Sequence, residues 1–246
     1  MINKRPLSLF NLAELGRIVE EFGNKSRIFN SEAQFQFELA WKIKEQFDCE
    51  VKLEELSRVQ DIEKIDKKGK VKNVKKDYTD IILESDNLRI AIELKYKTSA
   101  FEMKEENVLL KSHGAVDLGA YDFLWDVNRL QVLTGEENNT VKQKCNRGYA
   151  LMLTNDEAYW KAQPSETINR QFLIGGDANG HGCLKEGKHE WFNTDNKPGL
   201  SKVILNNPSR AQRITFRKDY CYRWQNYCSL TGQKNVDFKF MIVEVD

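Results

Sequence analysis

The sequence of 246 residues lacks the features that mark several broad classes of protein. Nowhere do about 18 apolar residues run together, so no segment is long and apolar enough for an ordinary membrane-spanning helix. The formal net charge is only +1, so the overall charge does not point to a polyanionic partner. Any nucleic-acid surface must therefore come from local basic patches, and no membrane partner is expected.

Cysteine is also scarce and irregularly placed. The five cysteines are odd in number and follow no regular spacing, which favours a reducing compartment over a disulfide framework. The first residues, Met1 to Pro6, lead into no long apolar stretch, so no signal peptide is expected. These observations predict a cytoplasmic protein.

Sequence motifs of three large enzyme classes are missing. There is no G-x-x-x-x-G-K-[ST] loop, no G-x-S-x-G elbow and no H-E-x-x-H helix, so ATP-driven, serine-hydrolase and zincin functions have no support. A zinc site could be assembled from His181, Cys183, His189, Cys221 and Cys228, but their spacings match no established ligand pattern.

What the sequence does contain is a hairpin signal over residues 77 to 97. Two runs rich in isoleucine and leucine flank Asp86-Asn87, a pair that suits a two-residue turn. If Ser85 and Leu88 close this turn, one face of the hairpin is entirely aliphatic and suited to a core. The expected opposed pairs are Glu84–Arg89, Leu83–Ile90, Ile82–Ala91, Ile81–Ile92 and Asp80–Glu93.

The other face of this hairpin brings Asp80, Glu93 and Lys95 together, because side chains alternate along a strand. Two carboxylates suit Mg²⁺, which prefers oxygen ligands, and the Leu94 carbonyl could add a third oxygen. The lysine could orient an attacking water or offset the charge that develops on a phosphate. The alternative is a surface hairpin whose charges merely pair with one another.

The pattern Asp-x12-Glu-x-Lys across two strands resembles the PD-(D/E)xK superfamily of restriction-endonuclease-like nucleases. The resemblance covers residues 32 to 97, with Thr79 where the proline of the motif name would stand. It implies a mixed sheet flanked by helices, Mg²⁺ as the cofactor with Mn²⁺ as a substitute, and phosphodiester hydrolysis. By position, Asp80 and Glu93 would be metal ligands and Lys95 the catalytic lysine.

A further acid lies on a predicted helix that begins after Ser31, where Gln34 completes a capping-box pattern. Glu32 falls on the apolar stripe of this helix, one turn before Phe35. In the resembled family an acid on the first core helix often assists metal binding, and Glu32 matches that place. The alternative is that Glu32 only complements the helix dipole.

Elsewhere the apolar patterns predict α/β organisation. A helix over 117–133 between two hydrophobic strands, the second at 147–155, predicts a crossover and a parallel strand pair. Residues 99–113 are expected to be helical or irregular. The expected fold is therefore a restriction-endonuclease-like mixed β-sheet flanked by helices, with additional C-terminal strands and loops. We expect a single domain over 1–246, with a helical N-terminal part at 1–47, a catalytic core at about 31–160 and an irregular, β-rich part at about 161–246.

Two groups of basic residues are weaker candidates for nucleic-acid binding. Lysines gather just before Asp80, and arginines interleave with aromatic residues near the C-terminus, a composition that can contact phosphates and bases. Solvated surface charges explain both groups equally well. The residues are Lys72, Lys75, Lys76, Arg213, Arg217 and Arg223.

Together these patterns predict a Mg²⁺-dependent DNA endonuclease, either of restriction type or a related phage-defence or repair enzyme. The alternatives are a catalytically silent nucleic-acid-binding or interaction protein on the same fold, and an RNA nuclease. Whether the protein forms a homodimer stays open at this point.

Overall fold

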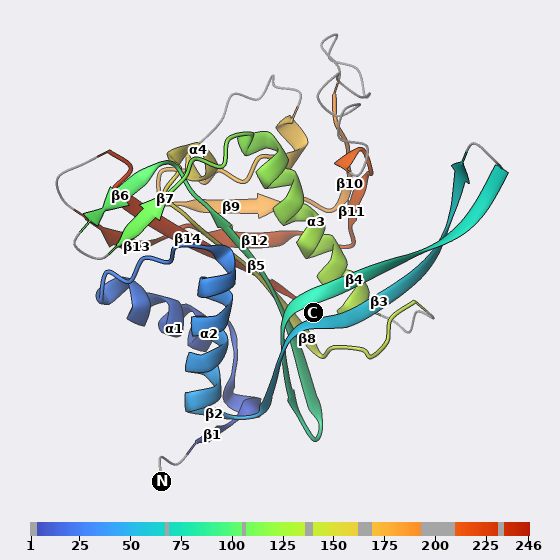
Figure 1. The fold of residues 1–246 in the computed structure, drawn as a ribbon, viewed down its shortest axis with the longest axis horizontal. Coiled ribbons are helices and arrows are strands. Elements are labelled where there is room, and N and C mark those ends of the chain that lie inside the picture. Colours follow the sequence, from blue (N-terminus) through green and yellow to red (C-terminus); the bar gives the residue numbers. More distant parts are fainter. Residues whose placement is uncertain are drawn as a thin grey trace.

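A six-stranded mixed sheet with the order β13-β14-β8-β5-β4-β3 forms the centre of the computed structural model (Figure 1). The structure describes residues 4–66, 69–104, 107–135, 140–161, 169–192, 210–230 and 234–246, without the side chains of 60–75. The β5–β8 pair is parallel, and the other neighbouring pairs are antiparallel. The strands are β3 (Glu50–Asp66), β4 (Gly69–Ser85), β5 (Leu88–Lys97), β8 (Arg147–Thr154), β13 (Gln225–Ser229) and β14 (Asp237–Val245).

Shorter elements pair outside this sheet. The two-stranded pairs are β1 (Arg5–Pro6) with β2 (Phe47–Asp48), β6 (Phe101–Met103) with β7 (Val108–Leu110), β9 (His181–Leu184) with β12 (Tyr220–Arg223), and β10 (Gly187–His189) with β11 (Ile214–Phe216). Short helical turns are η1 (Leu7–Leu9), α4 (Glu157–Trp160) and η3 (Arg170–Phe172). The expectation of helical or irregular structure over 99–113 is wrong, because β6 and β7 form a small hairpin there.

Three longer helices flank the sheet, and their starts follow from local capping. Helix α1 (Leu12–Asn24) begins after Asn11, whose side chain accepts a hydrogen bond from a backbone N–H of the first turn. Helix α2 (Glu32–Gln46) begins after Ser31, whose hydroxyl accepts from the N–H of Gln34, as predicted. Helix α3 (Val116–Thr134) forms most of the connection between β5 and β8, and it makes the predicted crossover between these parallel strands.

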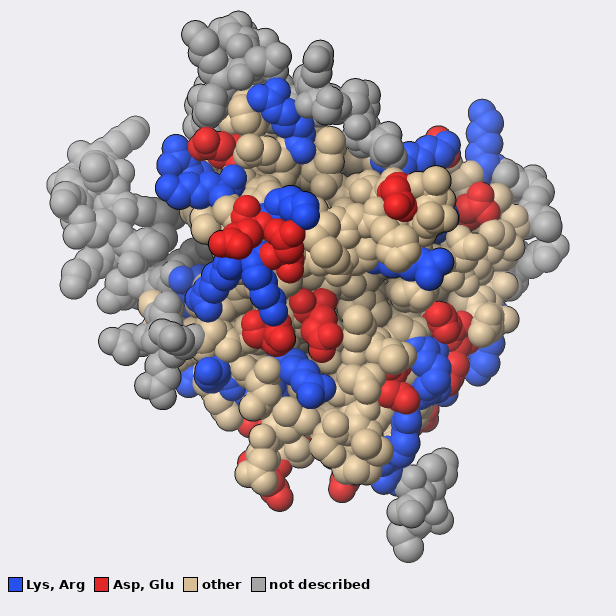
Figure 2. Space-filling view, turned by 180° about the vertical axis from the view of Figure 1, so that it is seen from behind, with Lys and Arg blue, Asp and Glu red and all other residues tan. Residues whose placement is uncertain are grey.

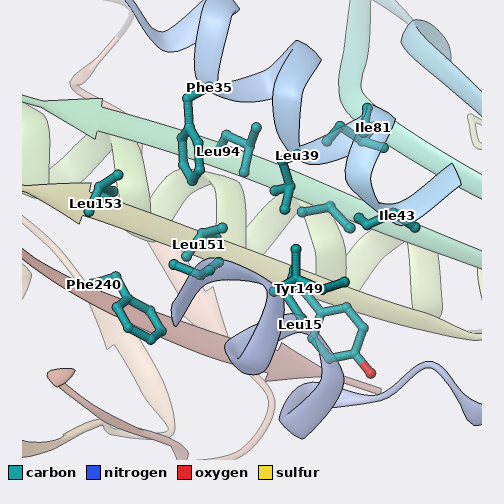
Figure 3. Packing of buried hydrophobic residues seen from close by; sticks show 14 of the residues in the cluster. Leu15, Phe35, Leu39, Ile43, Ile81, Leu94, Tyr149, Leu151, Leu153 and Phe240 are labelled. Carbon is teal, nitrogen blue, oxygen red and sulfur yellow. The ribbon is translucent and has the colours of Figure 1, made fainter. Parts of the chain in front are cut away.

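The core lies on both faces of the sheet. On one face α1 and α2 pack against Ile81, Leu94 and Leu151, as Figure 3 shows from close by. On the other face α3 packs against Ile82 and Met152. The hairpin of β4 and β5 is therefore covered on both sides, whereas its sequence predicted one core face and one face bearing the site.

The predicted register of this hairpin is confirmed for every expected pair except Asp80–Glu93. The structure pairs Ser85 with Leu88 across the turn and continues without a bulge to Ile81 opposite Ile92. The pairing of β4 with β5 ends there, one position before Asp80 and Glu93. Along its other edge, strand β4 pairs with β3 from Gly69 to Glu84, and the two strands run out from the sheet as a long ribbon (Figure 1). The strand ends diverge at the predicted site.

Two cysteines form a disulfide, contrary to the expectation from the odd number of cysteines. Cys183 and Cys221 lie directly opposite each other on β9 and β12 and are bonded. The sequence gave no sign of this, because the two positions are 38 residues apart and only strand pairing aligns them. Both sulfurs are thereby removed from the zinc alternative.

None of the helices within the described ranges combines the length and the hydropathy that a membrane-spanning segment needs.

Candidate active site

Asp80 lies where β4 leaves β5, and both neighbouring segments hold it in place. Its Oδ2 accepts a 2.6 Å hydrogen bond from the main-chain N–H of Leu94. Its main-chain carbonyl accepts a 2.6 Å hydrogen bond from Nε2 of Gln36 on α2. The main chains of β4 and β5 no longer pair here. The Leu94 N–H therefore donates to the Asp80 carboxylate, where a backbone carbonyl would accept in a continuing pair of strands.

Glu93 and Lys95 project from β5 toward α3, on the side opposite Leu94. Glu93 is only 2% exposed, and its Oε1 lies 2.9 Å from Nη2 of Arg129. The ammonium Nζ of Lys95 lies 2.5 Å from Oδ2 of Asp126 and donates to the Leu94 carbonyl at 3.1 Å. The two strand residues that the sequence singled out are thus both paired with residues of one helix.

Asp126 and Arg129, the two helix residues, were not predicted to belong to the site. They are also paired with each other, with Nη1 of Arg129 3.4 Å from Oδ1 of Asp126. Arg129 further donates to the main-chain carbonyl of Tyr78, so it also reaches β4. Both residues are polar, and their helix was expected to connect two hydrophobic strands, so that one side of it must face the sheet. The sequence did not show that these two residues lie on the side that faces the sheet.

Glu32 reaches the same region from the first turn of α2. Its Oε2 accepts a 2.6 Å hydrogen bond from the main-chain N–H of Tyr96, next to Lys95. It also interacts electrostatically with Asp80 and Lys95. The structure therefore brings Glu32 to the cluster, and its place in the first turn is equally compatible with the dipole role.

The cluster carries more negative than positive charge when all its groups are ionised. Its acids are Glu32, Asp80, Glu93 and Asp126, and its bases are Lys95 and Arg129, which leaves an excess of two negative charges. Burial raises the pKa of Asp80 to about 6, against the opposing effects of Lys95 and the Leu94 N–H. Burial likewise raises the pKa of Glu93 well above its ordinary value, although Arg129 opposes this.

The two bases respond in the opposite direction. Burial by itself lowers the pKa of Lys95, but the carboxylates of Asp126, Glu32 and Asp80 outweigh it and raise the pKa. The pKa of Arg129 is raised in the same way, with Glu93 and Asp126 outweighing burial. Both bases therefore stay charged at neutral pH, while burial favours the protonated forms of Asp80 and Glu93. An additional cation would favour their ionised forms.

The donor atoms fit a hard divalent cation in kind. Asp80 and Glu93 supply carboxylate oxygens and Leu94 supplies a carbonyl oxygen, a set that suits Mg²⁺, which usually takes one or two carboxylates and completes its shell with water and phosphate. Oε1 of Glu93 is buried and has no partner with hydrogen-bond geometry, despite the nearby guanidinium. Within the described part of the chain, however, no three His, Cys, Asp or Glu side chains form a group that could hold a metal.

Of the weaker nucleic-acid candidates on β4, Lys76 is exposed, and the side chains of Lys72 and Lys75 lie outside the described residues. Arg213 pairs with Glu190 at 2.8 Å, while Arg217 and Arg223 are exposed beside β11 and on β12. On the face shown in Figure 2, basic and acidic side chains are interspersed, and the coloured residues form no continuous basic field.

Comparisons with known proteins add no relative. No protein-family model, no curated protein and no solved structure matches this chain.

Proposed function

We propose that the chain is a Mg²⁺-dependent endonuclease that hydrolyses DNA phosphodiester bonds, of restriction type or a related phage-defence or repair enzyme, on a restriction-endonuclease-like fold. One observation carries the proposal. A largely buried cluster in which acids outnumber bases by two lies where two strands diverge, and a lysine lies within it. A purely structural cluster needs no such surplus of acids, because each buried carboxylate without a cation of its own costs free energy when it is ionised.

Each residue has a distinct task in this proposal. Asp80 and Glu93 would hold the ion, with the Leu94 carbonyl as a further oxygen. The bound ion would supply charge stabilisation and activate water near the phosphate. Lys95, held by Asp126, offers its ammonium to the charge that develops on the phosphate oxygens during attack. Glu32 supports the arrangement by fixing the Tyr96 N–H and the end of β5.

The choice of nucleic acid as substrate comes from two sources. The Asp-x12-Glu-x-Lys pattern resembles that of the PD-(D/E)xK nucleases, and all three positions lie in one cluster here. Lys76, exposed on β4 four residues before Asp80, is placed to contact a phosphate backbone. The experiment is to incubate the purified protein with plasmid DNA and with RNA, each with Mg²⁺, with Mn²⁺ and with a chelator. Metal-dependent nicking or linearisation of the plasmid supports the proposal, and RNA cleavage alone would shift it to an RNA nuclease.

A second function has an observation in its favour. Lys95 pairs with Asp126 and Glu93 pairs with Arg129, so the charges also satisfy one another within the fold. A catalytically silent protein that binds nucleic acid or another partner could keep these pairs for stability. Nucleic-acid binding without cleavage under any divalent ion would favour this alternative over the nuclease.

A further inference from the structure

A continuous chain of ion pairs links the two charged residues of β5 through helix α3. Glu93 Oε1 lies 2.9 Å from Arg129 Nη2, and Arg129 Nη1 lies 3.4 Å from Asp126 Oδ1. The other carboxylate oxygen of Asp126, Oδ2, lies 2.5 Å from Lys95 Nζ. The chain therefore begins at one end of the Glu-x-Lys tripeptide of β5 and returns to its other end.

These four side chains are largely removed from water. The exposed fractions of the side chains alone are 1% for Glu93, 5% for Asp126 and 16% each for Lys95 and Arg129. Ion pairs in such surroundings are electrostatically stronger than at the surface, although Oε1 of Glu93 and Oδ2 of Asp126 lack partners with hydrogen-bond geometry. The chain can therefore set the positions of its members as well as neutralise them.

Lys95 in particular needs such a support. Its ammonium sits on a flexible four-carbon stem, and besides the ion pair with Asp126 it donates a hydrogen bond to the carbonyl of its own neighbour, Leu94. A group that acts on a developing charge must be held within a fraction of an ångström of its working position. The strand alone does not provide this, whereas the helix does.

We propose that Asp126 is a positioning residue for Lys95, and that Arg129 couples this position to Glu93 so that α3 aligns the metal-binding and phosphate-facing groups of the site. This inference rests on the proposed nuclease function. Neither residue touches the substrate in this proposal: each acts through a residue of β5. Helix α3 is then a functional component of the site and not only the crossover between parallel strands.

The test compares two aspartates of the same helix. Asp122 lies one turn before Asp126 and forms a bidentate pair with Arg210, at 2.7 and 2.8 Å, outside the cluster. Asp122→Asn therefore removes a comparable carboxylate–guanidinium pair from α3 without touching Lys95. Asp126→Asn removes the support of Lys95, and Asp126→Glu keeps the charge and serves as the rescue variant.

Three quantities are measured for each variant with Mn²⁺ and plasmid DNA: kcat, KM and the Mn²⁺ dissociation constant. We expect Asp126→Asn to lower kcat by about 10- to 100-fold, as loss of a residue that orients an active group typically does. KM and Mn²⁺ affinity should stay within about twofold of wild type, because no ligand is removed. Asp122→Asn should cleave like wild type, and Asp126→Glu should recover part of the loss.

A second readout does not depend on cleavage. The ¹H–¹⁵N NMR signal of the Lys95 ammonium should be visible in the wild type and in Asp122→Asn, because the ion pair slows its exchange with water. It should be lost in Asp126→Asn. If Asp126→Asn does not fold, Arg129→Lys replaces it. Arg129 uses two different nitrogens for Glu93 and Asp126, and lysine lacks this rigid fork, so the variant should lower kcat about tenfold.

The outcomes separate the two proposals. Equal cleavage by Asp126→Asn and Asp122→Asn would overturn the positioning role, as would a loss of Mn²⁺ affinity parallel to the loss of rate, which would make Asp126 a ligand. If wild-type protein cleaves nothing, the nuclease proposal fails. The NMR signal then still decides the positioning role, and an unchanged Lys95 signal in Asp126→Asn would overturn it.

Discussion

The main-chain N–H of Leu94 donates a 2.6 Å hydrogen bond to Oδ2 of Asp80. Asp80 lies one position and Leu94 two positions beyond Ile81–Ile92, the last residue pair of β4 and β5. Asp80 thus closes the junction of two diverging strands with its side chain. The same carboxylate is the one that we propose as a metal ligand. Its structural and functional roles can be separated, because the N–H needs only an acceptor oxygen, whereas the ion needs a negative one.

Asp80→Asn should therefore fold like the wild type and lose metal-dependent cleavage. The amide oxygen of asparagine still accepts the Leu94 N–H, but the negative charge that holds the ion is gone. We expect the melting temperature to be unchanged or raised and Mn²⁺ binding, measured by calorimetry, to be lost. Asp86→Asn in the exposed hairpin turn is the matched control and should bind Mn²⁺ normally. Full Mn²⁺ affinity in Asp80→Asn would remove Asp80 from the ligand set.

Lys95→Ala should abolish cleavage while metal binding persists. An electrostatic donor of this kind stabilises the transition state by roughly 3–4 kcal/mol, so the rate should fall about 10²- to 10³-fold. DNA affinity should change far less, because one charge among many phosphate contacts contributes little. Lys97→Ala, two residues further along the same face of β5, is the control in plasmid assays. Cleavage by Lys95→Ala at the wild-type rate would refute the catalytic assignment.

Glu32→Gln tests whether Glu32 does more than support the start of α2. Glutamine can still accept the Tyr96 N–H, so the fold should persist. If the negative charge assists the ion, half-maximal cleavage should require a higher Mn²⁺ concentration, by about tenfold. Glu45→Gln, at the exposed end of the same helix, should leave the titration unchanged. Identical titrations for both variants would leave Glu32 only its dipole role.

The metal-free protein should lose stability as the pH rises through the range in which Asp80 ionises. Burial raises the pKa of Asp80 from 3.8 to about 6, so the folded protein holds a proton that the unfolded chain has released between these values. The free energy of unfolding therefore falls with rising pH across this window, by up to about 3 kcal/mol from this group. Glu93, whose pKa is also raised, shifts stability in the same direction, and acids with lowered pKa values, such as Glu14, shift it in the opposite one. The quantity to measure is therefore the difference between wild type and Asp80→Asn.

In urea titrations at intervals between about pH 4 and pH 7, that difference should change in the stated direction. Divalent ions should reverse the trend, because they bind the ionised form and stabilise the folded state more at high pH. A difference between wild type and Asp80→Asn that does not depend on pH would contradict the raised pKa.

Reduction of the Cys183–Cys221 disulfide should destabilise the β9–β12 region. A cross-link that closes a loop of this length typically contributes about 3–4 kcal/mol by restricting the unfolded chain. Thermal melts with and without dithiothreitol should show a lower melting temperature under reduction, and Cys183→Ser should abolish that difference. Cys228→Ser is the control, since Cys228 is a free cysteine. A melting temperature that is the same with and without dithiothreitol would mean that the bond is absent in solution.

The sequence was sufficient for the parts of the fold that depend on local pattern. Alternation and the Asp86-Asn87 turn predicted the register of β4 and β5, and capping predicted the start of α2. The apolar run at 147–155 and the helix before it predicted the parallel pair of β5 and β8. These signals depend on neighbours within a few residues, which is why they could be read directly.

Contacts between distant segments could not be predicted in this way. Asp126 and Arg129 carry no local mark of their role, because what matters is which strand residues their helix covers. The same holds for Cys183 and Cys221, which only the pairing of β9 with β12 brings together. The length of the ribbon that β3 and β4 form beyond Asp80 was not predicted either.

The crossover of α3 also has a consequence for the order in which the protein folds. β4 and β5 are joined by a two-residue turn, so they can pair early, within microseconds in an isolated hairpin. The parallel pairing of β5 with β8 must wait for a long loop to close around α3, which is slower. Until the helix docks, Glu93 and Lys95 remain hydrated and lack their partners from α3. The charged cluster around Glu93 and Lys95 is thus assembled in the late, non-local step, and native-state hydrogen exchange should show it opening before the hairpin on which it is built.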